Sequence, residues 1–146
     1  MSDDLTTYRR ILPHWRMGGA TYFITWRLDR DQAELDGAER SLVAGALTHF
    51  SGERYALLAY VVMDNHVHVL VTPISPHELQ AIVHSWKSFT AHRLQRPGRA
   101  KRIWQTEYFD RIVRNEIELR EKLDYIAGNP LKRWPGVTSY PWLWIE

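Results

Sequence analysis

Hydrophobic and polar residues recur with two different periods along the chain, and the shorter period predicts strands. Residues 20–29 and 66–72 alternate between apolar and polar positions, as half-buried strands do. Residues 54–63 form a largely apolar run that predicts another strand, and a fourth is predicted over 108–114. The turn dipeptide Asp64-Asn65 joins the second strand to the third, so these two are expected to pair as an antiparallel hairpin.

The alternation in the third strand separates two kinds of side chain. Val67, Val69 and Val71 fall on one face, which we expect to pack against the core. His66 and His68 fall on the other face, together with the remaining even-numbered positions of the strand.

The longer period, of three to four residues, predicts three helices. Each is expected to begin at a capping residue that is followed by an acidic residue. The three starts are Asp36 with Glu39, Ser75-Pro76 with Glu78, and Asn115 with Glu118. The expected ends are Ser51-Gly52, the Arg96-Pro97-Gly98 segment, and Asn129-Pro130.

The order of the elements predicts the fold class. Strand, helix, hairpin, helix and strand make the split βαβ order of an α+β, ferredoxin-like fold. Such a fold has a four-stranded antiparallel sheet with helices on one face, and the last helix is an addition that could meet the histidines on the open face. The 146 residues suit a single domain, with an N-terminal arm at 1–18 and a tail at 131–146 whose structure is not assigned.

Composition excludes several classes of protein. The chain has no cysteine, so disulfides and thiolate metal sites are excluded. Its first residues are acidic and polar, unlike a signal peptide, and no apolar run is long enough to cross a bilayer. We therefore expect a cytoplasmic protein without a membrane partner.

The distribution of charge points to an anionic partner, although the net charge is only +2. Two groups of cations stand out: Arg9 and Arg10 near the start, and Arg93, Arg96, Arg99, Lys101 and Arg102 in one segment. Seven tryptophans accompany them, and aromatic rings beside cations suit single-stranded nucleic acid. A solvated basic loop and a tryptophan-rich core would give the same pattern.

The histidine pair has the spacing of an open metal site. Neighbouring same-face positions on a strand bring the imidazoles of His66 and His68 side by side. Imidazole is a common metal ligand, and two such ligands leave coordination positions open, as catalytic sites require. The alternative is a pair of histidines on an exposed strand face without a metal.

The last predicted helix carries a candidate nucleophile. Tyr125 and Asn129 are four residues apart, so they share one helix face, and the Asn129 oxygen is a suitable third ligand for Mg²⁺ or Mn²⁺. Attack of Tyr125 on a DNA phosphate would give a 5′-phosphotyrosine and a free 3′-hydroxyl. The base for the phenol stays open between Asp124, Lys122 and a metal-bound water. Alternatively, Tyr125 is a core aromatic.

Several separated motifs, in this order, resemble one family. They are Tyr8-Arg9-Arg10, Gly18-Gly19, the segment from Val61 to His68, Trp104-Gln105, the segment from Asp110 to Asn115, Asp124-Tyr125-Ile126, and the segment from Asn129 to Lys132. The chain resembles the single-tyrosine transposases of the His-hydrophobic-His nuclease group, and among them the REP-associated tyrosine transposases.

The resemblance implies a ferredoxin-like fold, a divalent metal, Mg²⁺ or Mn²⁺, and single-stranded DNA with a hairpin as substrate. It implies metal ligation by His66 and His68, with Asn129 completing the site, and attack by Tyr125. It also implies a monomer, with a dimer left open. From charge and family position, the candidate DNA-binding residues are Arg9, Arg10, Arg93, Arg96, Arg99, Lys101, Arg102, Trp104, Arg111 and Arg114.

The chain departs from the family pattern at a few positions. Asn129 replaces the glutamine of insertion-sequence relatives, which favours the REP-associated branch. Asp64 stands where the family usually has proline, and Arg133-Trp134-Pro135-Gly136 replaces a run of small residues. Two other functions stay open: a hairpin-binding protein that does not cut DNA, and a metal-dependent hydrolase that uses water as its nucleophile.

Overall fold

A five-stranded antiparallel sheet forms the centre of the molecule. The computed structural model describes residues 19–146, so the predicted arm at 1–18, with Arg9 and Arg10, lies outside the described residues. The strand order is β4-β1-β3-β2-β5, and every neighbouring pair is antiparallel. The strands are β1 (Thr21–Arg27), β2 (Tyr55–Val62), β3 (His66–Pro73), β4 (Phe109–Val113) and β5 (Leu143–Ile145).

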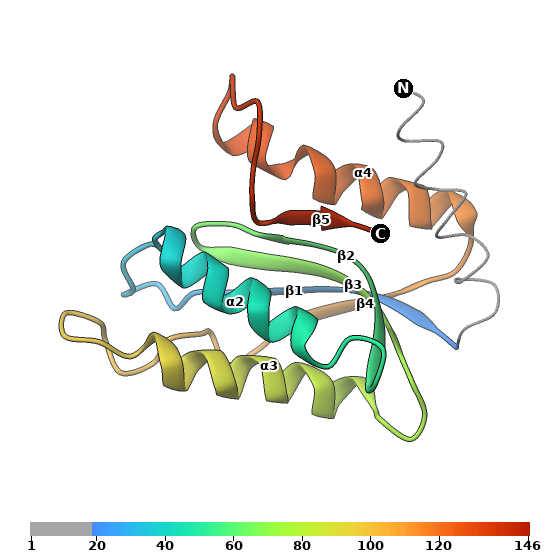
Figure 1. Cartoon of the computed structure of the whole chain (residues 1–146), viewed down its shortest axis with the longest axis horizontal. Coiled ribbons are helices and arrows are strands. Elements are labelled where there is room, and N and C mark those ends of the chain that lie inside the picture. Colours follow the sequence, from blue (N-terminus) through green and yellow to red (C-terminus); the bar gives the residue numbers. More distant parts are fainter. Residues whose placement is uncertain (1–18) are drawn as a thin grey trace.

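Helices cover both faces of the sheet. The helices α2 (Gly37–His49) and α3 (Leu79–Leu94) lie on one face, and α4 (Glu116–Arg133) lies on the other (Figure 1). The α+β class, the ferredoxin-like order and the added C-terminal helix on the open face are therefore confirmed. None of the helices in residues 19–146 combines the length and the apolar character that crossing a bilayer requires.

The alternation of β3 supplies both hydrophobic cores. Val67, Val69 and Val71 are buried in the core beneath α2 and α3, as predicted. Leu70 is buried in the second core, beneath α4, where it packs with Leu123 and other apolar residues. His66 and His68 share the α4 side of the strand with Leu70, because side chains two residues apart on a strand point the same way.

The predicted four-stranded sheet is incomplete, because the unassigned tail adds a strand. β5 pairs with β2 from Val61↔Leu143 to Ala59↔Ile145, and so covers an edge that would otherwise be exposed. Its three residues are too few for an alternating pattern, so the sequence alone gave no strand signal there.

The predicted start of the second helix is wrong. Ser75-Pro76 lies in a turn, where the His77 N–H donates to the Ile74 carbonyl at 2.9 Å. α3 begins at Leu79 with Glu78 as its N-cap residue, and no side-chain hydrogen bond caps it. The Ser-x-x-Glu spacing is therefore part of a turn here and does not make a capping box.

The predicted end of the last helix is also wrong, since α4 continues through Pro130 to Arg133. The Asn129 side-chain amide donates to the Tyr125 carbonyl at 2.9 Å, in the turn before the proline. After the proline the helix resumes, and the Trp134 N–H donates to the Pro130 carbonyl at 2.8 Å. The helical face shared by Tyr125 and Asn129 therefore stays intact.

The start of α2 is confirmed and has a further role. Asp36 and Glu39 form the predicted capping box, and the Glu39 carboxylate also accepts from Arg99 at 2.7 Å and from Arg96 at 3.1 Å. Burial by itself would raise the pKa of Glu39, but hydrogen bonds from Arg99, the Asp36 backbone and Arg96 outweigh burial and lower it from 4.5 to about 2. Arg99, whose side chain is 0% exposed, thus fastens the loop after α3 to α2.

Replacing Glu39 with glutamine should lower the free energy of unfolding by roughly 3 kcal/mol, because the buried Arg99 charge would lose its partner. In the wild type this stabilisation is complete above pH 4.5, the ordinary pKa of Glu39, and is lost as the pH falls toward 2, its pKa in the folded state. Urea unfolding followed by tryptophan fluorescence from pH 2 to 7 measures both effects. Glu53→Gln, at an exposed position, is the control, and equal stability of the two variants would contradict this role.

Candidate active site

The histidine pair lies in the middle of the sheet, beneath α4. His66 pairs with Arg27 of β1 and His68 pairs with Thr25, so these four side chains share one face. The imidazole centroids are 4.7 Å apart. His66 is half-buried, whereas His68 is only 2% exposed. The two rings are therefore side by side, as the strand spacing predicts.

The hydrogen bonds of His66 leave a lone pair facing Asn129. His66 Nδ1 lies 2.6 Å from the Asn65 Oδ1, and because a carbonyl oxygen only accepts, Nδ1 carries the proton of the neutral ring. The other nitrogen, Nε2, is then an acceptor, and it lies 3.4 Å from the Asn129 Oδ1. The Asn129 amide is oriented by its own bond to the Tyr125 carbonyl. Two acceptors thus face each other with no proton between them.

His68 presents a second acceptor without a partner. Its Nδ1 lies 2.7 Å from the Thr25 Oγ1, while its Nε2 is buried and has no hydrogen-bond partner. Burial lowers the pKa of His68 to about 3, and the neighbouring His66 ring and the charges of Arg27 and Lys122 add to this effect. Burial, followed by the charge of Arg27, also lowers the pKa of His66. Both rings are therefore neutral at pH 7, the form that binds metals.

These acceptors fit a divalent cation. A buried nitrogen without a partner is uncommon in proteins, and a cation beside it would satisfy its lone pair. The Thr25 hydroxyl and the Asn65 amide orient the two rings through their far nitrogens, as the outer partners of metal-binding histidines do. Within residues 19–146 no third His, Cys, Asp or Glu joins the pair. The third donor available is therefore the Asn129 amide oxygen.

Tyr125 lies beside the histidines and is open to solvent. Its side chain is 44% exposed, and its ring centroid is 5.1 Å from that of His68 and 6.0 Å from that of Phe23. The Lys132 ammonium lies 5.6 Å from the centre of the tyrosine ring. Tyr125 is therefore on the molecular surface and is not the core aromatic that sequence reasoning left open.

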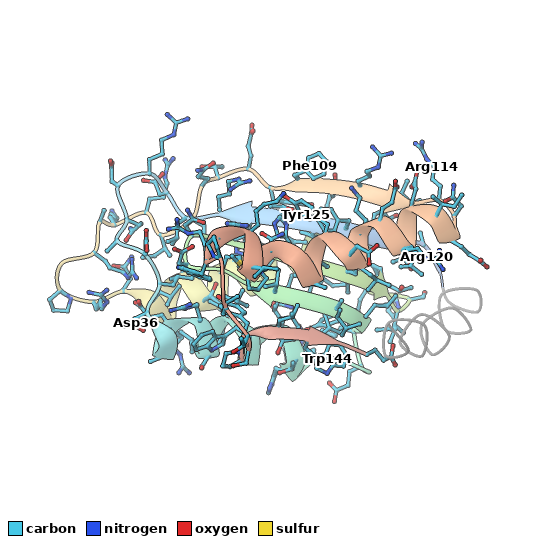
Figure 2. All side chains as sticks on the ribbon, turned by 90° about the horizontal axis from the view of Figure 1, so that it is seen from above. Asp36, Phe109, Arg114, Arg120, Tyr125 and Trp144 are labelled. Carbon is cyan, nitrogen blue, oxygen red and sulfur yellow. The ribbon has the colours of Figure 1, made fainter. Side chains whose placement is uncertain are left out.

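Tyr125 and His68 line a groove with a volume of about 580 Å³. Phe23, Thr25, Arg27, Lys122 and Phe109 also line it. Figure 2 looks down onto α4 and shows Tyr125 and Phe109 toward the β4 edge, while Trp144 lies toward the β5 edge. The phenol of Tyr125, the imidazole of His68 and the two cations Arg27 and Lys122 therefore line one groove.

An ion pair fastens α4 to the turn before the histidines. Arg133, at the end of α4, donates to the Asp64 Oδ2 through Nη2 at 2.7 Å and through Nε at 3.1 Å. Burial would raise the pKa of Asp64, but the hydrogen bonds and charge of Arg133 outweigh it and keep the carboxylate ionised. Two of the positions that depart from the family pattern, Asp64 and Arg133, therefore bond to each other.

Four of the predicted DNA-binding residues lie in the α2 and α3 layer or in its core. Arg99 is buried against Glu39, and Arg96 also bonds that carboxylate. Trp104 is only 5% exposed, and its Nε1 donates to the Thr90 hydroxyl at 2.9 Å. Arg93 lies over the Phe89 ring on α3. The prediction that Arg99 and Trp104 contact DNA is corrected, since both side chains are buried and neither presents a surface to DNA.

The other predicted DNA-binding residues within 19–146 are exposed. Lys101 and Arg102 lie in the loop that follows Arg99, and Arg102 lines a hollow with Arg30 and Gln105. Arg111 pairs with Phe23 across the sheet, so its side chain is on the α4 face, 3.4 Å from Glu118. Arg114 is exposed at the end of β4. All of these guanidinium and ammonium groups remain accessible to phosphate.

Sequence reasoning missed Thr25, Arg27, Phe109 and Lys132. The first three come next to the histidines or the groove through the pairing of β1 with β3 and β4, and a single sequence does not specify that register. Lys132 is seven residues after Tyr125, a spacing that returns to the same helix face, and so it could have been found.

Similarity to known proteins identifies the family of the chain. The model of a known family, described as "Transposase IS200 like", matches residues 22–129. The REP-associated tyrosine transposase of Escherichia coli (strain K12) is 26% identical over 145 residues, and the match covers 93% of this chain and 84% of that protein.

Two solved structures share the fold. One is a REP-associated tyrosine transposase bound to a REP hairpin, with a TM-score of 0.71 and 24% identity over 87% of this chain and 77% of that one. The other is a candidate transposase from Deinococcus radiodurans, with a TM-score of 0.51 and 21% identity over 74% of this chain and 88% of that one. Because the family model matches well over half of its residues, the chain belongs to the IS200-like transposase family and is similar to the REP-associated tyrosine transposases.

Proposed function

We propose that this transposase cleaves and rejoins single-stranded DNA beside a hairpin-forming, REP-like repeat, and that Tyr125 is its nucleophile. The observation that carries the proposal is an exposed phenol beside two neutral imidazoles whose free lone pairs have no protein donor. The hairpin bound by the similar transposase supports the choice of substrate.

In the proposed reaction the Tyr125 Oη attacks the phosphorus of a DNA phosphodiester. The bond to the 3′ oxygen breaks, that oxygen leaves and takes up a proton, and a 5′-phosphotyrosine forms. The reverse attack by a 3′-hydroxyl rejoins the strand and releases the tyrosine. The phosphotyrosine linkage is itself a phosphodiester, so rejoining the strand needs no external source of energy.

His66, His68 and Asn129 are proposed to hold one Mg²⁺ or Mn²⁺. When bound, the cation neutralises charge on the phosphate and orients the scissile bond. Arg27 and Lys122 line the same groove and would attract the DNA backbone, and Lys132 adds a third cation next to Tyr125. The Asn129 amide nitrogen donates to the Tyr125 carbonyl, and this hydrogen bond orients the amide oxygen of Asn129 toward His66.

We propose that the enzyme acts as a monomer. The tyrosine, both histidines, Asn129 and the groove all come from a single chain, from β1, β3, β4 and α4. The described residues therefore assemble the proposed site without a residue from a second copy.

Tyr125→Phe should abolish covalent capture of DNA. Incubating the protein with end-labelled hairpin DNA and Mn²⁺ should give an adduct that resists denaturation, and the variant should give none, because it lacks the attacking oxygen. Tyr60→Phe, at a buried position near the β5 edge, should form the adduct at the wild-type rate. Cleavage by wild-type protein without an adduct would indicate a hydrolase, and binding without cleavage would indicate a non-catalytic hairpin-binding protein.

His66→Ala and His68→Ala should each slow cleavage by roughly 100-fold or more, since a metal ligand contributes several kcal/mol to the transition state. Each should also weaken Mn²⁺ binding in calorimetric titrations without DNA, whereas hairpin affinity should stay within about twofold. His84→Ala on α3 is the matched control, and its side chain is exposed. A collapse of hairpin affinity with intact Mn²⁺ binding would assign the histidines to DNA recognition instead.

Asp64→Asn and Arg133→Met should each slow adduct formation by about 5-fold in single-turnover assays, because the last turn of α4 would lose its tie to the histidine turn. Hairpin affinity should not change. The double variant should be no slower than the slower single variant, since both remove the same ion pair. Additive losses would show that the two residues act separately.

A further inference from the structure

The groove beside Tyr125 contains a large exposed ring that the reaction described above does not use. Phe109 is 56% exposed, although it lines the groove with His68 and Tyr125. It pairs with Thr25 across the sheet, so its side chain points to the α4 face, where the histidines also lie. The ring therefore presents an apolar surface inside the groove, where a bound ligand could cover it.

The ring of Phe109 is free to stack. Elsewhere on the surface, Phe89 is covered by Arg93, and Trp144 stacks on Tyr60 with centroids 6.0 Å apart. Phe109, by contrast, makes no ring contact with any residue in the part of the chain that the structure describes. Its neighbour on the other face of β4, Ile112, pairs with Tyr22 and points away from the groove.

Two cations line the same groove. Arg27 is exposed and pairs with His66 in the strand register, and Lys122 of α4 lies close enough for its charge to act on His68. Glu107 is the one carboxylate among the residues that line the groove. A free aromatic face next to two cations matches a nucleotide, whose base stacks while its phosphates meet the positive charges.

We propose that this groove binds the nucleotide next to the cleaved phosphodiester, with its base stacked on Phe109 and its phosphates beside Arg27 and Lys122. The inference rests on the proposed function and adds a base-binding subsite to it. Stacking on one ring tolerates any base but favours the larger purines, so this position should prefer purines without strict sequence recognition.

β4 is an edge strand, so a second copy of the chain is a competing occupant of this region. Pairing of two edge strands uses backbone groups in the plane of the sheet, whereas the Phe109 side chain rises from the sheet into the groove. The ring lines the same groove as the nucleophile and the two cations, and this favours a nucleotide.

The test couples a protein change to a DNA change. In a Tyr125→Phe background, which prevents cleavage, fluorescence anisotropy measures the affinity for a hairpin with single-stranded flanks, with an abasic residue placed at each flank position in turn. Phe109→Ala should weaken binding of the intact DNA by about 5- to 150-fold. One abasic position should weaken binding to the Phe109 protein by a similar factor and should add nothing further in Phe109→Ala.

Two further variants keep the result interpretable. Phe109→Trp should keep the affinity, because it preserves a stacking surface. Ile112→Ala removes an exposed apolar side chain from the opposite face of the same strand and should bind like the parent protein. Thermal unfolding confirms that each variant is folded.

Two results would overturn the proposal. One is that the affinity losses caused by Phe109→Ala and by each abasic position multiply independently, and the other is that Phe109→Ala binds the intact DNA as tightly as the parent protein. A change from dimer to monomer in sedimentation on replacing Phe109 with alanine, together with no coupling to any abasic position, would assign the ring to self-association instead. The adduct assay separates the two levels of inference. An adduct with a Phe109-independent affinity rejects only the subsite, whereas base coupling without an adduct rejects only the proposed function.

Discussion

The packing of α4 across the open face of the sheet brings the groups of the proposed site together. Leu119, Leu123 and Ile126 of α4 form an apolar stripe that is buried against the sheet. Tyr125 precedes Ile126 in sequence and lies at the edge of this contact. The same stripe sets Asn129 within 3.4 Å of His66. The hydrophobic contact that stabilises the helix therefore also assembles the site.

β3 satisfies two demands at once. Its valines must be buried beneath α2 and α3, and the two-residue period of a strand then places His66 and His68 on the α4 side. Burial keeps both imidazoles neutral, and Thr25 and Asn65 hold their far nitrogens. The buried Nε2 of His68 has no hydrogen-bond partner, and this lowers the stability of the fold unless a cation binds there. Functional sites commonly contain such locally unfavourable groups.

Local sequence patterns correctly predicted the features that depend on residues close together in sequence. The alternation in β3, the capping box at Asp36 and the helix face of Tyr125 and Asn129 are all of this kind. The wrong predictions concern features whose conformation or burial is set by tertiary contacts. Ser75-Pro76 resembles a helix start but forms a turn, Pro130 is tolerated inside α4, and Arg99 and Trp104 are buried by partners distant in sequence. Phe109 was missed because only the register of β4 places it beside Thr25.

The account depends on a cation that links the imidazoles of β3 to the amide of α4 beneath the phenol. The most direct measurement is anomalous diffraction from crystals soaked in Mn²⁺. We expect one anomalous peak within bonding distance of the Nε2 atoms of His66 and His68 and of the Asn129 Oδ1, with Tyr125 beside it. Saturating Mn²⁺ without a peak among these atoms, or with the two imidazoles turned apart, would contradict the account.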